Sequence, residues 1–155
     1  MEIYLEMLEE KHFQAPLQFE KENREYFEKS VPGRGETYYH FETFTEIQRT
    51  LIKEQIVGKS YFYMVKNLDG VIIARVNKVD LDKEERCAHV RYRVGEAASG
   101  KGVAKKAVQL LMSELREKGI TRLYAKTTLS NKGSQRVLEN NGFVKVDLDE
   151  CEDIL

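Results

Sequence analysis

The chain has 155 residues, 41% of them hydrophobic and 33% charged, and its formal net charge is −1 at pH 7. These values indicate a single globular domain over residues 1–155 and argue against a general electrostatic attraction to nucleic acid or to an anionic membrane. Because its two cysteines, Cys87 and Cys151, lack the number and spacing of a metal site or a disulfide framework, and no apolar run is long enough to cross a bilayer, we expect a cytoplasmic protein with reduced thiols and no metal.

The first half of the chain has the patterns of an antiparallel sheet with two helices. Strands are predicted over residues 3–7, 60–66, 71–78 and 84–94. Apolar residues at helical spacing predict helices over 15–29 and 41–57, and the Val31-Pro-Gly-Arg-Gly35 segment ends the first of them. The turn residues Asn67-Leu-Asp-Gly70 predict a hairpin between the two middle strands.

The second half alternates between helices and strands. We expect helices over 103–118 and 132–140, and strands over 121–127 and 143–148. A strand, a helix and a following strand form a unit that almost always crosses over right-handedly and makes its strands parallel. The predicted class is therefore α/β, with a mixed central sheet, antiparallel in its N-terminal half and parallel in its C-terminal half, flanked by about four helices.

The connection between the strand ending at Val94 and the helix beginning at Val103 is rich in small residues. It reads Gly95-Glu-Ala-Ala-Ser-Gly-Lys-Gly-Val-Ala104. Small residues before a helix let backbone N–H groups approach an anion, and the helix N-terminus adds the positive end of its dipole. With Lys101 as a further cation, this turn predicts binding of a phosphate or pyrophosphate.

Two common nucleotide sites do not fit this turn. A dinucleotide-binding fold has its glycine turn after the first strand, whereas this turn follows about four strands. A Walker loop requires a Lys-Ser/Thr pair after its second glycine, and here Val103 follows Gly102.

The turn, together with Asn131-Lys-Gly-Ser134 and Val137-Leu-Glu-Asn-Asn-Gly-Phe143, resembles the GCN5-related N-acetyltransferases (GNAT). In that family the pattern Gln/Arg-x-x-Gly-x-Gly/Ala binds the pyrophosphate of coenzyme A. Gly102 and Ala104 match its last positions, whereas Ser99 replaces the Gln or Arg. The resemblance covers about residues 1–143 and implies the GNAT fold with acetyl-CoA as co-substrate.

The resemblance implies roles for particular residues. Coenzyme-binding positions are Val94, Ser99, Gly100, Lys101, Gly102, Val103, Ala104 and Asn131. The backbone N–H of Val94 would polarise the thioester carbonyl, and Ser134 would protonate the leaving thiolate. His89 replaces a glutamate that many family members have in an Ala-Glu-hydrophobic context, and it would act as the general base. Glu85 and Glu96 are weaker candidates for the base.

The N-terminal half resembles the ribosomal-protein (Rim) branch, which acetylates protein N-terminal amines. The similar segments are Phe19-Glu-Lys-Glu-Asn-Arg24, Tyr26-Phe27 and Val31-Pro-Gly-Arg34. An α-amine has a pKa of about 7.7–8 against about 10.4 for lysine, so it demands less of a base at pH 7. Aromatic residues between the first two helices, Tyr38 and Tyr39 among them, either line a peptide slot or pack the loop, and packing is the expected role.

Other acceptors and roles remain open from the sequence. A polyamine or an aminoglycoside is the alternative amine acceptor, and a non-catalytic acyl-CoA-binding module is the alternative from another class. The family usually continues beyond the Gly-Phe strand into one more strand, whereas only residues 147–155 follow here. We expect a monomer or a homodimer.

Overall fold

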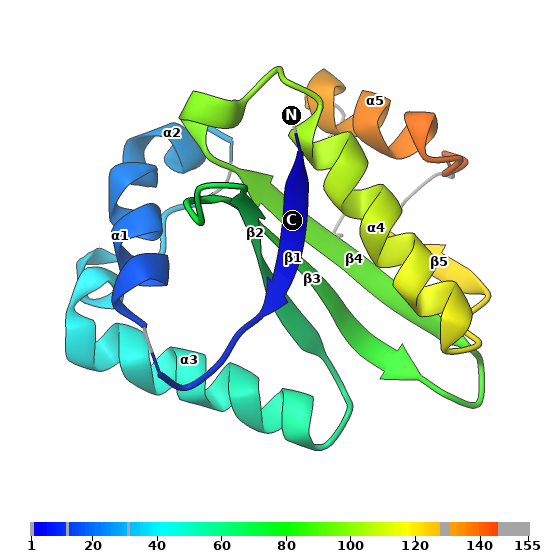
Figure 1. Ribbon diagram of the computed structural model, residues 1–155, viewed down its shortest axis with the longest axis horizontal. Coiled ribbons are helices and arrows are strands. Elements are labelled where there is room, and N and C mark those ends of the chain that lie inside the picture. The colour runs from blue at the N-terminus through cyan, green and yellow to red at the C-terminus, as the bar shows by residue number, and fades with distance from the viewer. Residues whose placement is uncertain (1, 12, 31, 128–130, 146–155) are drawn as a thin grey trace.

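A five-stranded sheet with the order β1-β2-β3-β4-β5 forms the centre of the protein, whose computed structural model describes residues 2–11, 13–30, 32–127 and 131–145 (Figure 1). The strands are β1 Ile3–Met7, β2 Tyr61–Asn67, β3 Ile72–Asp82, β4 Cys87–Val94 and β5 Arg122–Tyr124. Strands β1 to β4 are antiparallel, and β4 and β5 are parallel. The predicted mixed α/β sheet is therefore confirmed.

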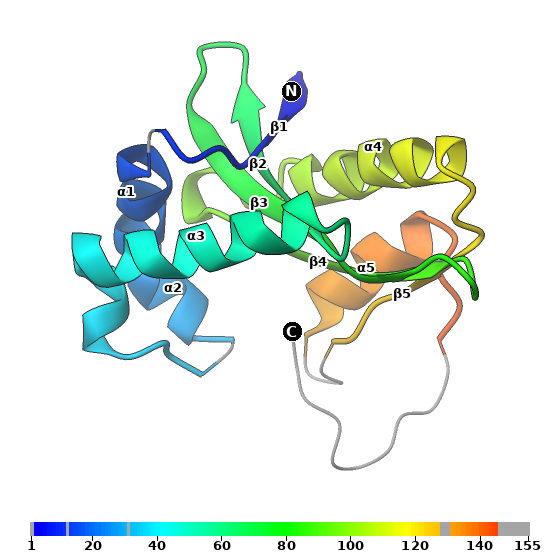
Figure 2. The same cartoon turned by 90° about the horizontal axis from the view of Figure 1, so that it is seen from below.

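Helices cover both faces of the sheet. They are α1 Gln14–Glu22, α2 Arg24–Glu28, α3 Phe41–Ile56, α4 Val103–Glu117 and α5 Lys132–Asn140, with the short 3₁₀ helices η1 Glu36–Tyr39 and η2 Glu96–Ala98. Helices α1 to α3 lie on one side of the sheet, and α4 and α5 lie on the other (Figures 1 and 2). No helix in the described ranges is long and apolar enough to cross a membrane.

Each face of the sheet has its own apolar core. Helix α4 presents Ala107, Val108, Leu111 and Leu115, each almost fully buried, to one face. On the opposite face Phe44 of α3 packs with residues of α1, η1 and β2. Because neighbouring side chains of a strand point to opposite faces, β2 supplies Phe62 to one core and Tyr63 to the other.

The structure corrects the helix predicted over residues 15–29, because it breaks at Asn23 between α1 and α2. The backbone of Asn23 leaves the helical region (φ −106°, ψ 7°), and its side chain donates a hydrogen bond to Phe19 O at 2.9 Å. Asparagine competes in this way with the helix backbone. The other predicted helices over 41–57, 103–118 and 132–140 are confirmed to within one residue at each end.

The C-terminal strands are shorter than predicted. Strand β5 comprises Arg122–Tyr124 rather than residues 121–127, and it pairs with β4 only from Cys87 to His89. The two strands therefore separate at their C-terminal ends, which leaves one side of β4 open. Residues 143–145 are not a strand, and the remainder of the strand predicted over 143–148 lies outside the described residues.

A buried ammonium group on β3 fixes α4 to the sheet. Lys78 is fully buried and lies 2.9 Å from Glu114 Oε1, which also accepts a hydrogen bond of 2.7 Å from Tyr63. Burial lowers the pKa of Lys78, which the Glu114 contact partly offsets. Burial alone would raise the pKa of Glu114, but the hydrogen bonds from Tyr63 and Lys78 outweigh it and lower that pKa.

Glu114→Gln is expected to lower the free energy of unfolding at pH 7 by about 1–3 kcal/mol, because a charge-assisted hydrogen bond is lost. Since the pKa of Glu114 is lowered by folding, its contribution is present above the unfolded value of about 4.3 and disappears as the pH falls through the folded value. In urea unfolding, the difference in free energy of unfolding between the wild type and Glu114→Gln should therefore become smaller below about pH 4. The same substitution at exposed Glu117 is the control, and a pH-independent difference would contradict the assignment.

Candidate active site

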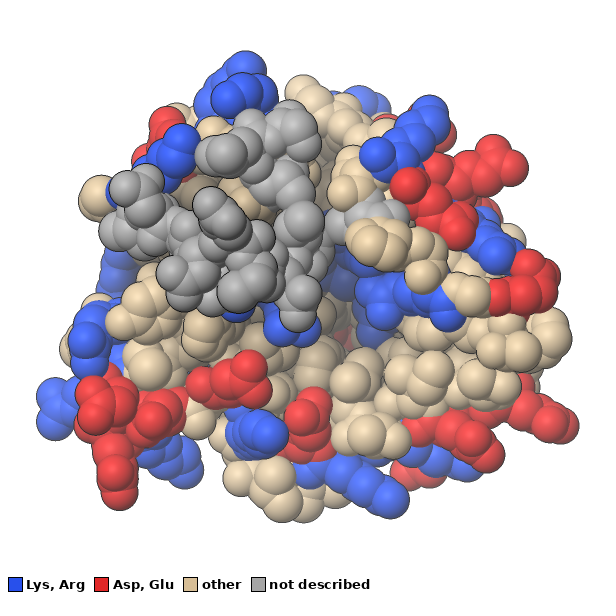
Figure 3. All heavy atoms as spheres, turned by 180° about the vertical axis from the view of Figure 1, so that it is seen from behind, with Lys and Arg blue, Asp and Glu red and all other residues tan. Residues whose placement is uncertain are grey.

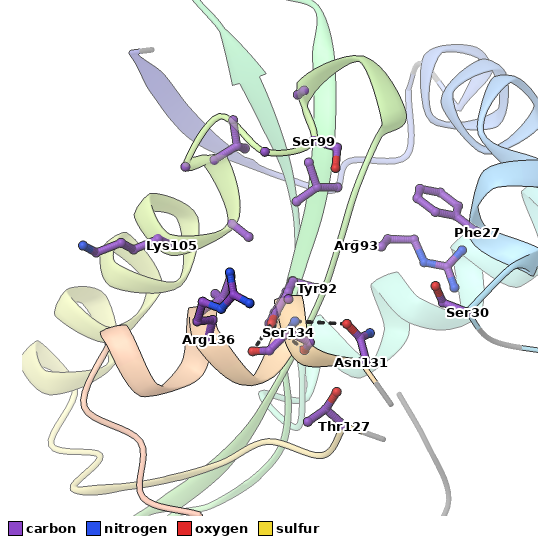
Figure 4. A pocket seen from close by; sticks show the side chains of 18 of the residues that line it. Phe27, Ser30, Tyr92, Arg93, Ser99, Lys105, Thr127, Asn131, Ser134 and Arg136 are labelled. Atoms are coloured by element: carbon purple, nitrogen blue, oxygen red, sulfur yellow. Dashed lines mark hydrogen bonds between the residues drawn. The ribbon is translucent and has the colours of Figure 1, made fainter. Parts of the chain in front are cut away.

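A cleft of about 710 Å³ lies at the open side of β4. Its walls come from α2, the end of β4, the turn before α4, and α5 (Figure 4). Because Tyr92 and Arg93 are neighbours on β4 and both line it, the cleft borders both faces of the strand. Viewed from behind, Lys and Arg side chains lie in a hollow near the centre of the molecule (Figure 3).

The turn before α4 has the conformation that its glycines allow. Gly100 and Gly102 have φ values of +74° and +76°, in the left-handed region that other residues rarely adopt. Within the described part of the chain no side chain caps the N-terminus of α4, and its first turn holds no acidic residue. The first backbone N–H groups of a helix have no partner inside it, so this end of α4 is suited to an anion.

Side chains of helix α2 and of its junction with α1 form hydrogen bonds to this turn. Asn23 Oδ1 accepts a hydrogen bond of 2.8 Å from the Glu96 N–H, and Tyr26 donates one of 2.9 Å to Ser99 Oγ. A Cβ atom at Gly95 would lie 3.0 Å from Phe19 and 3.2 Å from Asn23, so a larger residue there would crowd both side chains. The Ser99 hydroxyl, at the position where the family pattern has Gln or Arg, therefore has a structural partner on α2.

The Val94 N–H points toward the opening between β4 and β5. Gly95 N–H donates to Ile73 O of β3 at 2.9 Å, and successive amides of a strand point to opposite sides. The Val94 amide therefore faces away from β3. Since β5 pairs with β4 only as far as Tyr124, this amide faces the cleft rather than a neighbouring strand.

The start of α5 brings Asn131, Ser134 and Tyr92 together (Figure 4). Asn131 Oδ1 accepts a hydrogen bond of 3.0 Å from Ser134 N–H and so caps the helix. The Ser134 hydroxyl lies 2.7 Å from the Tyr92 hydroxyl, and Tyr92 also donates to Ser134 O at 3.3 Å. Burial raises the pKa of Tyr92, so its hydroxyl stays protonated and can donate.

The cleft brings together most of the residues selected from the sequence. Its lining includes Val94, Ser99, Gly100, Gly102, Val103, Ala104, Asn131 and Ser134. Lys101 is exposed and does not line the cleft. His89 also lies outside the lining, half-buried, with its ring centroid 5.4 Å from that of Tyr124. Of the weaker candidates, Glu85 is exposed and paired with Arg122, and Glu96 is exposed in η2.

Sequence reasoning missed four contributors to this site. Tyr92 and Arg93 line the cleft, and Asn23 and Tyr26 support the turn. Nothing local in the sequence pairs Tyr92 with Ser134, which lies 42 residues further along the chain. Tyr38 and Tyr39 are buried in the core beside α3, which confirms that they pack the loop.

Every charged side chain in the described lining of the cleft is basic. These side chains are Lys29, Arg93, Lys105 and Arg136. Lys105 and Arg136 belong to α4 and α5, whereas Lys29 and Arg93 lie on the side of α2. In the described ranges no group of three or more His, Cys, Asp or Glu residues could hold a metal ion.

The family model described as an acetyltransferase (GNAT) domain matches residues 2–144. The chain belongs to the GNAT acetyltransferase family. A relative, the probable N-acetyltransferase YjcK of Bacillus subtilis (strain 168), is 30% identical over 149 residues, which are 92% of this chain and 81% of YjcK. The protein is thus an acetyl-CoA-dependent N-acetyltransferase of the GNAT type.

Solved structures of other GNAT enzymes share the fold. The ribosomal-protein-S5-alanine acetyltransferase of Vibrio fischeri has a TM-score of 0.85 at 19% identity, over 94% of this chain and 81% of that one. RimJ of Mycobacterium smegmatis, in complex with CoA-disulfide, has a TM-score of 0.84 at 19% identity, over 94% and 71% of the two chains.

Proposed function

We propose that this GNAT enzyme acetylates the α-amine of a protein or peptide N-terminus. The observation that carries this proposal is the charge of the cleft, whose described lining contains four basic side chains and no carboxylate. A polyamine or an aminoglycoside carries several positive charges and would find no partner among these residues. The structural likeness to ribosomal-protein acetyltransferases supports the same class of acceptor.

The coenzyme is assigned to the turn before α4 and to the side of the cleft between α4 and α5. The uncapped N-terminus of α4 and the left-handed glycines suit a pyrophosphate, and Lys105 and Arg136 add positive charge there. Asn131, which already caps α5, and the Val94 N–H would hold the arm that leads to the thioester. Lys101, exposed at the tip of the turn, would contribute only long-range attraction.

The reaction follows from the groups at the opening of β4. The amine nitrogen attacks the thioester carbonyl carbon, whose oxygen is polarised by the Val94 N–H. The new N–C bond forms, the C–S bond breaks, and its electron pair leaves with the sulfur. Ser134 then gives its hydroxyl proton to the thiolate and receives one from Tyr92 across their 2.7 Å contact, while water in the cleft takes the proton that the amine releases and returns one to Tyr92.

The amine must lose a proton, and the described lining offers no Asp, Glu or His to take it. His89 lies three residues from Tyr92, about 10 Å along an extended strand, so a proton would reach His89 only through water. Nearby cations such as Arg93 favour the neutral form of an incoming amine. An α-amine, with its pKa of about 7.7–8, can then lose its proton to water without a strong general base.

Thiol release from acetyl-CoA with a panel of acceptors tests this function. Peptides with a free α-amine, the same peptides with a blocked N-terminus, polyamines and aminoglycosides form the panel. We expect turnover with the free peptides and none with the blocked ones. Turnover only with polyamines or aminoglycosides would overturn the proposal, and coenzyme binding with no turnover on any acceptor would favour a non-catalytic module.

Ser134→Ala is expected to lower kcat about tenfold to hundredfold, because the leaving thiolate loses its proton donor. The KM for acetyl-CoA should change little, since the Ser134 N–H that bonds Asn131 is kept. Steady-state kinetics on an accepted peptide measures both constants. Ser113→Ala, on the exposed face of α4, is the control, and an unchanged kcat in Ser134→Ala would remove Ser134 from the mechanism.

A further inference from the structure

Two arginines on neighbouring strands share one carboxylate beside the cleft. Arg75 of β3 and Arg93 of β4 are directly opposite each other in the sheet, so their positive charges repel each other. Glu20 of α1, only 1% exposed, separates them, with Oε2 3.0 Å from Arg75 and Oε1 3.1 Å from Arg93. Both oxygens of this carboxylate are occupied, and one negative charge faces two positive charges.

A third arginine increases this imbalance. The Arg34 guanidinium lies 5.0 Å from the ring centroid of Tyr38, and its positive charge adds to the effect of burial in lowering the pKa of Arg93. The nearby acidic residues Glu28 and Glu36 both pair with Arg24, at 3.5 and 2.8 Å, so these three residues together carry one negative charge. Arg34, Arg75 and Arg93, here called the arginine cluster, carry two positive charges in excess of Glu20, and one positive charge remains in excess when the Arg24 group is counted.

The Arg93 guanidinium is held in place and retains donors for a ligand. Its Cζ atom lies 4.6 Å from the ring centroid of Phe27, and Nη1 donates to Glu20. A guanidinium has five N–H donors, so among the described residues most of them remain available. In Figure 4 this side chain extends from β4 toward Phe27, on the side of the cleft away from Arg136. Arg75, by contrast, is buried and also bound to Gln48.

The arginine cluster lies close to the place where the amine reacts. Tyr92, which contacts Ser134, and Arg93 are consecutive residues on opposite faces of β4. A peptide advances about 3.3 Å per residue when extended. An acceptor whose amine is near Ser134 would therefore place its second or third side chain beside Arg93.

We propose that the acceptor carries a carboxylate near its amine, at the second or third residue of an N-terminus, and that Arg93 and Arg34 bind it. This rests on the proposed function and specifies its substrate class. The site favours a carboxylate because an anion supplies the negative charge that the arginine cluster lacks, and because arginine binds carboxylates through paired N–H donors. Lys29 adds a further positive charge at the same end of the cleft.

The test compares peptides that differ only at the second or third residue. Ser-Asp, Ser-Asn and Ser-Lys N-termini, with the same series shifted by one residue, are assayed with wild type, Arg34→Gln and Arg93→Gln. Free aspartate and glutamate show whether a carboxylate on a small amino acid suffices. Exposed Arg116→Gln on α4 is the matched control for loss of one positive charge.

For the wild type we expect kcat/KM on the acidic peptide to exceed that on the asparagine peptide at least tenfold, with the lysine peptide slowest. This ratio should fall toward one in Arg34→Gln and Arg93→Gln and persist in Arg116→Gln. If Arg93→Gln does not fold, because it disturbs Glu20, the ratio measured with Arg34→Gln decides the test, since Arg34 is exposed. Equal rates on all peptides, or a ratio that neither variant changes, would overturn this proposal while leaving N-terminal acetylation intact. Acetylation of free acidic amino acids but of no peptide would instead overturn the proposed function.

Discussion

Gly102→Asp is expected to weaken the binding of coenzyme A by at least about tenfold. Gly102 has a φ of +76° and is the N-cap residue of α4, at the end of the helix that we assign to the pyrophosphate. An aspartate there adds a negative charge beside an anion, a repulsion of several kcal/mol at about 4 Å for an effective dielectric constant of about 20. Isothermal titration calorimetry with coenzyme A measures the loss.

Gly119→Asp separates this effect from backbone strain. Gly119 has a similar φ of +80°, follows the other end of α4, and, like Gly102, has no atom within 4 Å of an added Cβ. Both variants therefore carry the same strain and the same charge change. We expect Gly119→Asp to bind coenzyme A like the wild type. Equal affinity of the two variants for coenzyme A would mean that the turn is not its binding site.

Glu20→Ala is expected to lower the free energy of unfolding by about 3–5 kcal/mol. The substitution leaves Arg75, which is 7% exposed, without a carboxylate and with Gln48 as its hydrogen-bond partner. Removing one member of a buried ion pair leaves a charge in a poorly solvated place, and this is the main cost. Urea unfolding at pH 7 measures the change.

The exposed ion pair between Glu10 and Arg49 is the matched control. Its atoms are 3.1 Å apart, like those of the Glu20 pairs, but both side chains are more than half exposed. Glu10→Ala is expected to cost less than about 1 kcal/mol, because water solvates both charges and screens them. A loss of that small size in Glu20→Ala would show that the arginine cluster does not depend on Glu20.

The coenzyme turn could be predicted from the sequence because its signal is local. The small residues from Gly95 to Ala104 lie between a strand and a helix, and both elements show their own periodicity. Together with the later segments Asn131–Ser134 and Gly142–Phe143, this turn carries the resemblance to the GNAT family, which implied coenzyme A. The resulting lining residues are contiguous or close in the chain, apart from those of α5.

The acceptor side could not be predicted in the same way because its contacts are long-range. Asn23 bonds the backbone of Glu96, 73 residues away, and nothing around Asn23 signals that bond. The pairing of Arg75 with Arg93 depends on the register of β3 and β4, which the sequence pattern leaves open. A continuous helix over 15–29 was wrong for a local reason, because the Asn23 side chain bonds the backbone of Phe19 at the point where the helix breaks.

His89 shows the limit of carrying a role over by position alone. Its place in the strand matches the family glutamate, but β4 and β5 still pair at His89 and separate only beyond it. The cleft consequently begins further along β4, at Tyr92. His89 therefore makes no direct contact with the amine, and a proton from the amine would reach it only through water in the cleft.

Mapping the acetylated atom tests directly whether the acceptor is an α-amine. A peptide with a free α-amine and one internal lysine is incubated with the enzyme and acetyl-CoA, and the product is sequenced by mass spectrometry. We expect a single acetyl group on the α-amine and none on the lysine side chain. Acetylation of the lysine, or of the same peptide after its N-terminus has been blocked, would contradict it.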